Sequence, residues 1–181
     1  MKKITNIAEV QEAGEGVRLQ AGGYICKYTK VEDKSDKEYL WMEFDIAEGE
    51  FKGYFADLNE RAGFWAGRCI RSYKETALPM FKRMCSAVTK SNPGYIFDGN
   101  TNADETTLIG KTVGIILGEE EYEGNDGSVK TRLYVSRECE VEKIRKNDFK
   151  VPALKKLAPA ATSGSASKPD MNVPDEEVPF N

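Results

Sequence analysis

The fold is decided by the stretch from residue 24 to residue 55, YICKYTKVEDKSDKEYLWMEFDIAEGEFKGYF. Within residues 38–46 the apolar and polar positions alternate, as they do in a β-strand with one buried face. This alternation predicts a strand with a core face and a solvent face. The core face receives Leu40, Met42, Phe44 and Ile46, and the solvent face receives Tyr39, Trp41, Glu43 and Asp45.

Two large aromatic side chains, Tyr39 and Trp41, fall on the solvent face of this strand. Soluble proteins rarely leave such side chains in water without a function. A twisted antiparallel sheet with aromatics on its open face can stack unpaired nucleic-acid bases. The alternative interpretation is that both rings lie beneath a helix or a neighbouring subunit.

Length and charge place limits on the rest of the chain. The 181 residues are typical of one domain, and the hydrophobic fraction of 40% suits an ordered domain with a polar appendage. We expect the domain to span residues 1–157 and the appendage to span residues 158–181. With 26 basic and 30 acidic residues the net charge is −4, so any nucleic-acid site must depend on local charge.

The sequence contains no histidine, which excludes Ser-His-Asp and Cys-His catalysis and most zinc sites. Four scattered cysteines without a Cys-x-x-Cys motif indicate free thiols in a reducing cytoplasm. The polar start is not a secretion signal, and no window is apolar enough to span a membrane. We therefore expect a cytoplasmic, non-enzymatic protein that has no catalytic residues, metal or cofactor and does not contact membranes.

Periodicity and turn residues predict the order of the elements. A short helix is expected near residues 7–13, strands at 24–31 and 38–46, and a third strand beginning at 51–55. A helix follows at 78–90, and strands at 112–122 and 128–137 flank a hairpin turn at 124–127. This is the element order of an OB-fold. The predicted fold class is all-β with one or two helices, a five-stranded OB-fold-like Greek-key barrel with a disordered acidic C-terminal tail.

Residues 61–90 carry seven basic side chains and one acidic side chain, although the chain as a whole is acidic. Aromatic residues are interleaved with these bases, a pattern that suits single strands because cations contact phosphates and rings stack on bases. The alternative is a solvated basic surface whose aromatics face the core. The predicted stacking residues here are Phe64, Trp65 and Tyr73, and the predicted phosphate contacts are Arg61, Arg68, Arg71 and Lys74.

The strand at 128–137 also places bases and an aromatic on one face. Lys130 and Arg132 are predicted to contact phosphate, and Tyr134 to stack on a base. The acidic run at residues 119–121 is interpreted as a solvated end that points away from any phosphate.

Residues 158–181 are rich in Ala, Ser, Pro and Gly and lack a periodic apolar face, so we expect them to be disordered. An acidic cluster that ends in an aromatic residue suits a basic, apolar pocket on another protein. The predicted partner-binding residues are Asp175, Glu176, Glu177, Val178, Pro179 and Phe180, with Asn181 as the last residue.

The chain resembles the single-stranded DNA-binding proteins of bacteriophages and prophages. The resemblance lies in AGGY at residues 21–24, RSYKE at 71–75, SNPGY at 91–95 and GEEEYEGNDG at 118–127. The ending is similar to the acidic tip of bacterial single-stranded DNA-binding proteins, except that phenylalanine is the last residue there and Asn181 follows it here.

This resemblance implies a protein that coats single-stranded DNA during phage replication or recombination in the host cytoplasm. It also implies that the C-terminal tip recruits replication and recombination proteins, and it is compatible with a homo-oligomer. Two alternatives stay open: an adaptor whose barrel binds protein, and a carboxylate-metal nuclease using residues such as Asp57 and Glu60. The same residues suit DNA and RNA.

Overall fold

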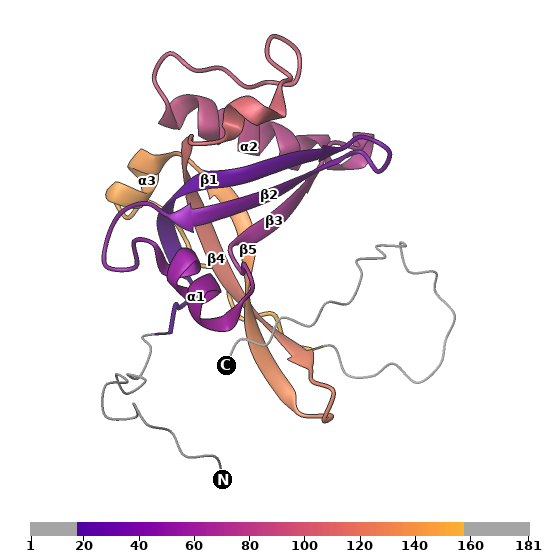
Figure 1. The fold of residues 1–181 in the computed structure, drawn as a ribbon, viewed down its shortest axis with the longest axis vertical. Coiled ribbons are helices and arrows are strands. Elements are labelled where there is room, and N and C mark those ends of the chain that lie inside the picture. The colour runs from indigo at the N-terminus through magenta and orange to yellow at the C-terminus, as the bar shows by residue number, and fades with distance from the viewer. Residues whose placement is uncertain (1–17, 158–181) are drawn as a thin grey trace, which may run out of the picture.

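The computed structural model describes residues 18–157. Its centre is a five-stranded antiparallel sheet in the order β3-β2-β1-β4-β5, which coils so that β1–β3 cross in front of β4 and β5 (Figure 1). The long first strand lies in the middle because it pairs with both β2 and β4. The strands are β1 (Gly22–Lys34), β2 (Tyr39–Ile46), β3 (Arg68–Ser72), β4 (Thr112–Glu123) and β5 (Val129–Cys139).

The predicted fold class is confirmed, since a five-stranded antiparallel sheet is accompanied by few helices. The α-helices of the described chain are α1 (Tyr54–Ala62), α2 (Leu78–Ser91) and α3 (Val141–Arg145), and the 3₁₀ helices are η2 (Glu75–Ala77) and η3 (Glu105–Leu108). Within residues 18–157 no backbone ladder joins the two edge strands, β3 and β5. The sheet is therefore coiled without being closed by main-chain hydrogen bonds, as in a partly open barrel.

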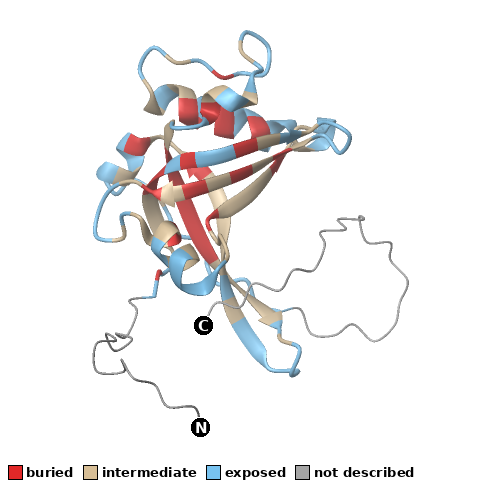
Figure 2. Ribbon diagram, in the orientation of Figure 1, coloured by how far each residue is buried: buried red, intermediate tan, exposed pale blue. Residues whose placement is uncertain are grey.

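The core fills the concave side of the coiled sheet (Figure 2). All four predicted core residues of β2 are buried, at 3% exposure or less. On β1 the buried positions shift phase at a β-bulge between Tyr28 and Lys30, so that both Tyr28 and Val31 face the core. Helix α2 adds an apolar stripe that includes Phe81, Met84 and Val88.

The predicted third strand at residues 51–55 is wrong. Residues 50–53 form a turn in which Gly53 has a φ of 80°, and α1 begins at Tyr54. The carboxylate of Asp45 accepts hydrogen bonds from the backbone N–H groups of Phe55 at 3.0 Å and Ala56 at 3.3 Å. An acid at the end of β2 thereby caps the first turn of α1. The third strand of the structure is β3, which begins only at Arg68.

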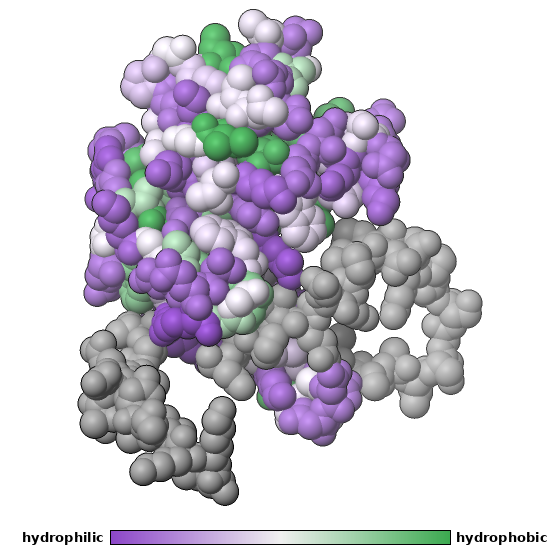
Figure 3. Space-filling view, in the orientation of Figure 1, coloured by the Kyte–Doolittle hydropathy of each residue, from purple (hydrophilic) through white to green (hydrophobic). Residues whose placement is uncertain are grey.

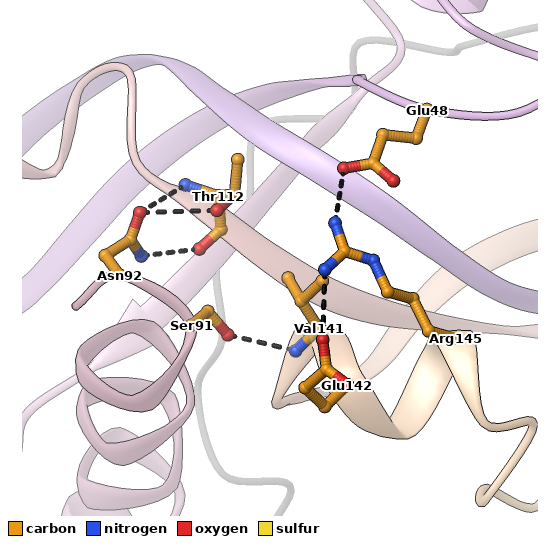
Figure 4. Close-up of polar contacts among 7 residues, drawn as sticks. All are labelled: Glu48, Ser91, Asn92, Thr112, Val141, Glu142 and Arg145. Carbon is orange, nitrogen blue, oxygen red and sulfur yellow. Dashed lines mark hydrogen bonds and ion pairs between the residues drawn. The ribbon is translucent and has the colours of Figure 1, made fainter.

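The predicted helix at 78–90 is confirmed as α2, which ends at Ser91. Its C-terminal end is fixed to β4 and α3 by side chains (Figure 4). The Asn92 carboxamide donates to the carbonyl of Thr112 at 2.8 Å and accepts from its N–H at 3.1 Å. Ser91 Oγ accepts from the N–H of Val141 at 3.0 Å. These bonds hold α2 across one end of the coiled sheet (Figure 1).

A buried ion pair joins the two edge strands. Arg71 Nε on β3 lies 2.6 Å from Glu138 Oε1 on β5, and the two residues are 8% and 3% exposed. The hydroxyl of Tyr28 and Nη2 of Arg71 are buried without a hydrogen-bond partner. Burial raises the pKa of Tyr28 well above its usual value, and the negative charge of Glu138 raises it further. The core thus contains a polar cluster at the seam between β3 and β5.

Hairpin β4–β5 extends well beyond the body of the sheet (Figure 1). Among residues 18–157 no helix is long and apolar enough to cross a membrane. The predicted helix near residues 7–13 and the predicted tail at 158–181 lie outside the described residues.

Candidate nucleic-acid interface

The convex face of β1–β2–β3 presents Trp41 at its centre. The strand registers place Trp41 opposite Glu32 on β1 and opposite Ile70 on β3. Because directly opposed residues of antiparallel strands share a face, this row and its neighbours form one surface, which we call the Trp41 face. The Trp41 face consists of Lys30, Glu32 and Lys34 on β1, Tyr39, Trp41 and Glu43 on β2, and Arg68, Ile70 and Ser72 on β3.

One cation contacts the indole ring on this face, and two more lie on the neighbouring strand β1. The Arg68 guanidinium carbon lies 5.4 Å from the centroid of the Trp41 ring, within cation–π range. Lys30 and Lys34 each lie 2.7 Å from the Glu32 carboxylate, and their hydrogen bonds lower the pKa of Glu32 to about 2. A ring flanked by Arg and Lys is suited to stack a base while the adjacent phosphates meet the cations.

The structure separates the predicted stacking aromatics into two groups. Trp65 and Tyr73 pack against the core. Trp65 Nε1 donates to the carbonyl of Gly67 at 3.0 Å, and the Tyr73 hydroxyl donates to Asp33 at 2.8 Å. Desolvation and this bond to Asp33 raise the pKa of Tyr73 to about 12. These two residues are better explained as structural aromatics, the alternative that the sequence left open for this segment.

The other predicted stacking residues lie away from the core cluster of the described chain: Tyr39, Trp41, Phe64 and Tyr134. All four are partly exposed. Tyr39 shares the Trp41 face, and Phe64 lies in the loop between α1 and β3. Tyr134 lies on a separate face of hairpin β4–β5, and Lys155 Nζ covers its ring at 3.5 Å from the centroid.

The predicted phosphate contact at Arg71 does not fit its position. Arg71 lies opposite Leu40, a core residue, and its guanidinium is engaged by Glu138 and by the carbonyl of Ile70 at 2.9 Å. At 8% exposure the side chain is not available to a phosphate at the surface. The alternation within β3 sends Arg68 outward and Arg71 inward, so we assign Arg71 to the core.

Apart from Arg68, which is partly buried, the remaining predicted phosphate contacts are exposed but dispersed. Arg61 is at the end of α1, where its Nε donates to the carbonyl of Asp57 at 3.3 Å. Lys74 lies two residues beyond the end of β3. Lys130 lies 3.4 Å from Asp126, and Arg132 lies 2.9 Å from Glu120. Only Arg68 of the predicted set is placed beside a predicted stacking ring by a measured contact.

Besides Lys30 and Lys34 on the Trp41 face, three residues around hairpin β4–β5 were not predicted from sequence. Tyr122 lies under the Arg132 guanidinium at 5.2 Å, and Lys155 lies over Tyr134. Glu120 contacts both cations, although the sequence predicts that residues 119–121 are a solvated acidic end that points away from any phosphate. The order base, base, aromatic along β5 is visible in the sequence. Tyr122 and Glu120 on β4 meet these residues only through the strand register, and Lys155 comes from the segment after α3.

The residues of the nuclease alternative, Asp57 and Glu60, line an open hollow beside α1 together with Glu50, Tyr54 and Arg61. Across residues 18–157 no group of three or more Cys, Asp or Glu side chains is placed to hold a metal ion. All four cysteines are free thiols. Burial raises the pKa of the Cys69 thiol to about 12, which disfavours a thiolate there.

Comparisons with known proteins do not assign a family. No protein-family model matches the chain, and no curated protein matches it.

Proposed function

We propose that this protein binds single-stranded DNA without sequence preference, has no enzymatic activity, and coats and protects DNA during phage replication or recombination. The proposal is supported chiefly by Trp41, a partly exposed indole at the centre of a convex sheet face, with the Arg68 guanidinium over its ring. Lys30 and Lys34 on the neighbouring strand supply further positive charge. Aromatic rings and cations together bind single strands because every base has a face that can stack.

The direct test is a titration of the full chain with oligo-dT at low and at high salt, followed by tryptophan fluorescence. Stacking on Trp41 is expected to quench emission, and the affinity is expected to fall as salt rises because bound counterions are released. A parallel titration with oligo-rU compares DNA with RNA. Emission that does not change at any oligonucleotide concentration, with no binding by anisotropy, would refute the proposal.

Arg68→Ala is expected to weaken binding to all sequences alike. Loss of one phosphate contact should flatten the slope of log K against log salt by about 0.7, the value for a single strand. Arg83→Ala is the matched control, since it removes one exposed positive charge on α2, outside the Trp41 face. Equal slopes for both variants would contradict a phosphate contact at Arg68.

A second part of the proposal concerns the C-terminal tip, residues 175–180, which lies outside the described residues. We propose that it recruits a replication or recombination protein, with Phe180 as the apolar anchor and three acids as steering charges. Tethered beside the basic surface, the same acids compete weakly with phosphate at low salt.

Deleting residues 175–181 is expected to abolish partner capture and to strengthen oligo-dT binding several-fold at low salt and little at high salt. Phe180→Ala should lose the partner and keep the DNA affinity, because it changes no charge. Pull-downs from host or phage-infected extract measure the first effect and anisotropy the second. Identical pull-downs for the full chain and Phe180→Ala would refute recruitment through this residue and leave DNA binding intact.

A protein-binding adaptor is the second candidate. Large apolar side chains are exposed at the start of α2, where Leu78 and Met80 are 46% and 50% exposed, and on the loop before β4, where Ile96 is 52% exposed. Figure 3 shows exposed apolar surface around α2 and the loop that follows it, and such surface favours contact with another protein. Failure to bind oligo-dT in the titration above would favour this candidate.

A further inference from the structure

Hairpin β4–β5 carries a second surface of aromatics and cations, which we call the hairpin face. Its residues follow from the register, in which Gly118 lies opposite Tyr134, Glu120 opposite Arg132 and Tyr122 opposite Lys130. Each tyrosine has a cation over its ring: Arg132 lies 5.2 Å from the centroid of Tyr122. Lys155 Nζ lies 3.5 Å from the centroid of Tyr134. The composition is that of a single-strand platform, but both rings are covered.

One carboxylate holds both covering cations. Glu120 Oε1 accepts from Arg132 Nε at 2.9 Å, and Glu120 Oε2 lies 3.7 Å from Lys155 Nζ. The Glu120 side chain is 23% exposed, whereas Arg132 and Lys155 are each more than half exposed. The two oxygens of Glu120 thus meet two cations, as two oxygens of a backbone phosphate would.

Lys155 reaches this surface because the chain after α3 lies along β4. We call residues 150–157 the strap. The Lys155 N–H donates to the carbonyl of Glu119 at 3.0 Å, and its carbonyl accepts from the N–H of Glu121 at 2.8 Å. Pro152 and Tyr134 can approach the backbone at Gly118 because glycine has no side chain. A Cβ atom on residue 118 would lie 2.6 Å from Pro152 Cγ. The strap therefore packs directly on the hairpin face.

We propose that Glu120 keeps the hairpin face closed, and that a single strand opens it by replacing the Glu120 carboxylate with backbone phosphate. Arg132 and Lys155 then turn from Glu120 to the phosphates, and the rings of Tyr122 and Tyr134 become free to stack on bases. The inference rests on the proposed function, and it adds to that function a second binding surface with its own internal competitor.

This closure has a measurable cost in affinity. In the free protein the two cations share the single Glu120 carboxylate, so a strand must compete with a negative charge that is always present. Exposed ion pairs are weak, so phosphate can displace this one. Removing the carboxylate should therefore favour binding, because Arg132 and Lys155 then reach the phosphates without first leaving Glu120.

The experiment uses the full chain and measures fluorescein-labelled oligo-dT by anisotropy over a series of salt concentrations. Glu120→Gln should bind at least about threefold tighter than wild type at low salt, because the strand no longer has to displace a carboxylate. The gain should shrink as salt rises, because salt screens the competing charge in wild type. Glu123→Gln is the matched control, since it removes one exposed acid from the same strand. It should leave the affinity nearly unchanged at every salt concentration.

A double-mutant comparison assigns the gain to the two cations. In the background Arg132→Met with Lys155→Met, the substitution Glu120→Gln should give no gain in affinity. Equal affinities and slopes for Glu120→Gln and Glu123→Gln, or a gain that persists without the two cations, would overturn the proposal while wild type still binds oligo-dT. Absence of binding by wild type would instead overturn the proposed function and this inference with it.

Discussion

Replacing Glu138 with glutamine is expected to lower the free energy of unfolding by about 3–5 kcal/mol, the usual cost of leaving a buried charge without its partner. The Arg71 guanidinium would stay in the core, 8% exposed, without a compensating carboxylate. Its Nη2 already lacks a hydrogen-bond partner there. Urea unfolding of wild type and variant, followed by circular dichroism, measures the difference.

The control for this prediction is an exposed ion pair of similar length. Lys90 Nζ lies 2.7 Å from Glu140 Oε1, with the lysine side chain 62% exposed. Lys90→Met should change stability by at most about 1 kcal/mol, because surface pairs contribute little. Replacing both core charges together, Arg71→Met with Glu138→Leu, should recover most of the loss. A Glu138→Gln variant as stable as wild type would show that the pair does not hold the seam.

The ion pair between Arg71 and Glu138 also joins the two edge strands of the sheet. Within the described chain β3 and β5 share no backbone ladder, so side chains must hold the two edges of the sheet together. Arg71 and Glu138 are the residues that meet across this seam, and α2 contacts both strands beside it. We expect loss of the pair to loosen β3, the strand that carries Arg68 to the Trp41 face.

Sequence periodicity predicted the elements whose pattern is regular. The strict alternation at residues 38–46 gave the correct strand and the correct buried face, and the apolar stripe from Leu78 gave α2. Periodicity failed at residues 51–55, where three aromatics around a turn resembled a strand start. The determinant there is Asp45, whose carboxylate caps α1 from ten residues away. A contact of that kind is not visible in a local pattern.

A bulge in β5 places the partner of Arg71 in the core. A register shift between Ile116 and Leu117 inserts one extra residue into β5 and changes the phase of its alternation, so that Glu138 faces the core. Simple alternation from Leu133 would have placed Arg137 inward instead. Counting charges in residues 61–90 likewise could not separate Arg68 from Arg71, because that difference depends on which face of β3 each occupies.

Trp41→Ala is expected to weaken oligo-dT binding by about 1–3 kcal/mol, or roughly 5- to 150-fold, the range measured for loss of one stacked base. The side chain lies on the convex face, outside the core cluster of residues 18–157, so its removal should leave the fold intact. Arg68 loses its cation–π partner but keeps its charge for phosphate. Anisotropy with labelled oligo-dT measures the affinity, and urea unfolding measures the stability.

Trp65 provides the matched comparison, because it packs against the core whereas Trp41 lies outside the core cluster of residues 18–157. Trp65 packs on the core, and its Nε1 donates to Gly67, so Trp65→Phe should reduce stability and leave oligo-dT affinity nearly unchanged. Each variant also leaves a single tryptophan, so quenching by oligo-dT should persist in Trp65→Phe and largely disappear in Trp41→Ala. The reverse result, with stability lost at Trp41 and affinity lost at Trp65, would move the interface from the convex face of β1–β3 to the loop between α1 and β3.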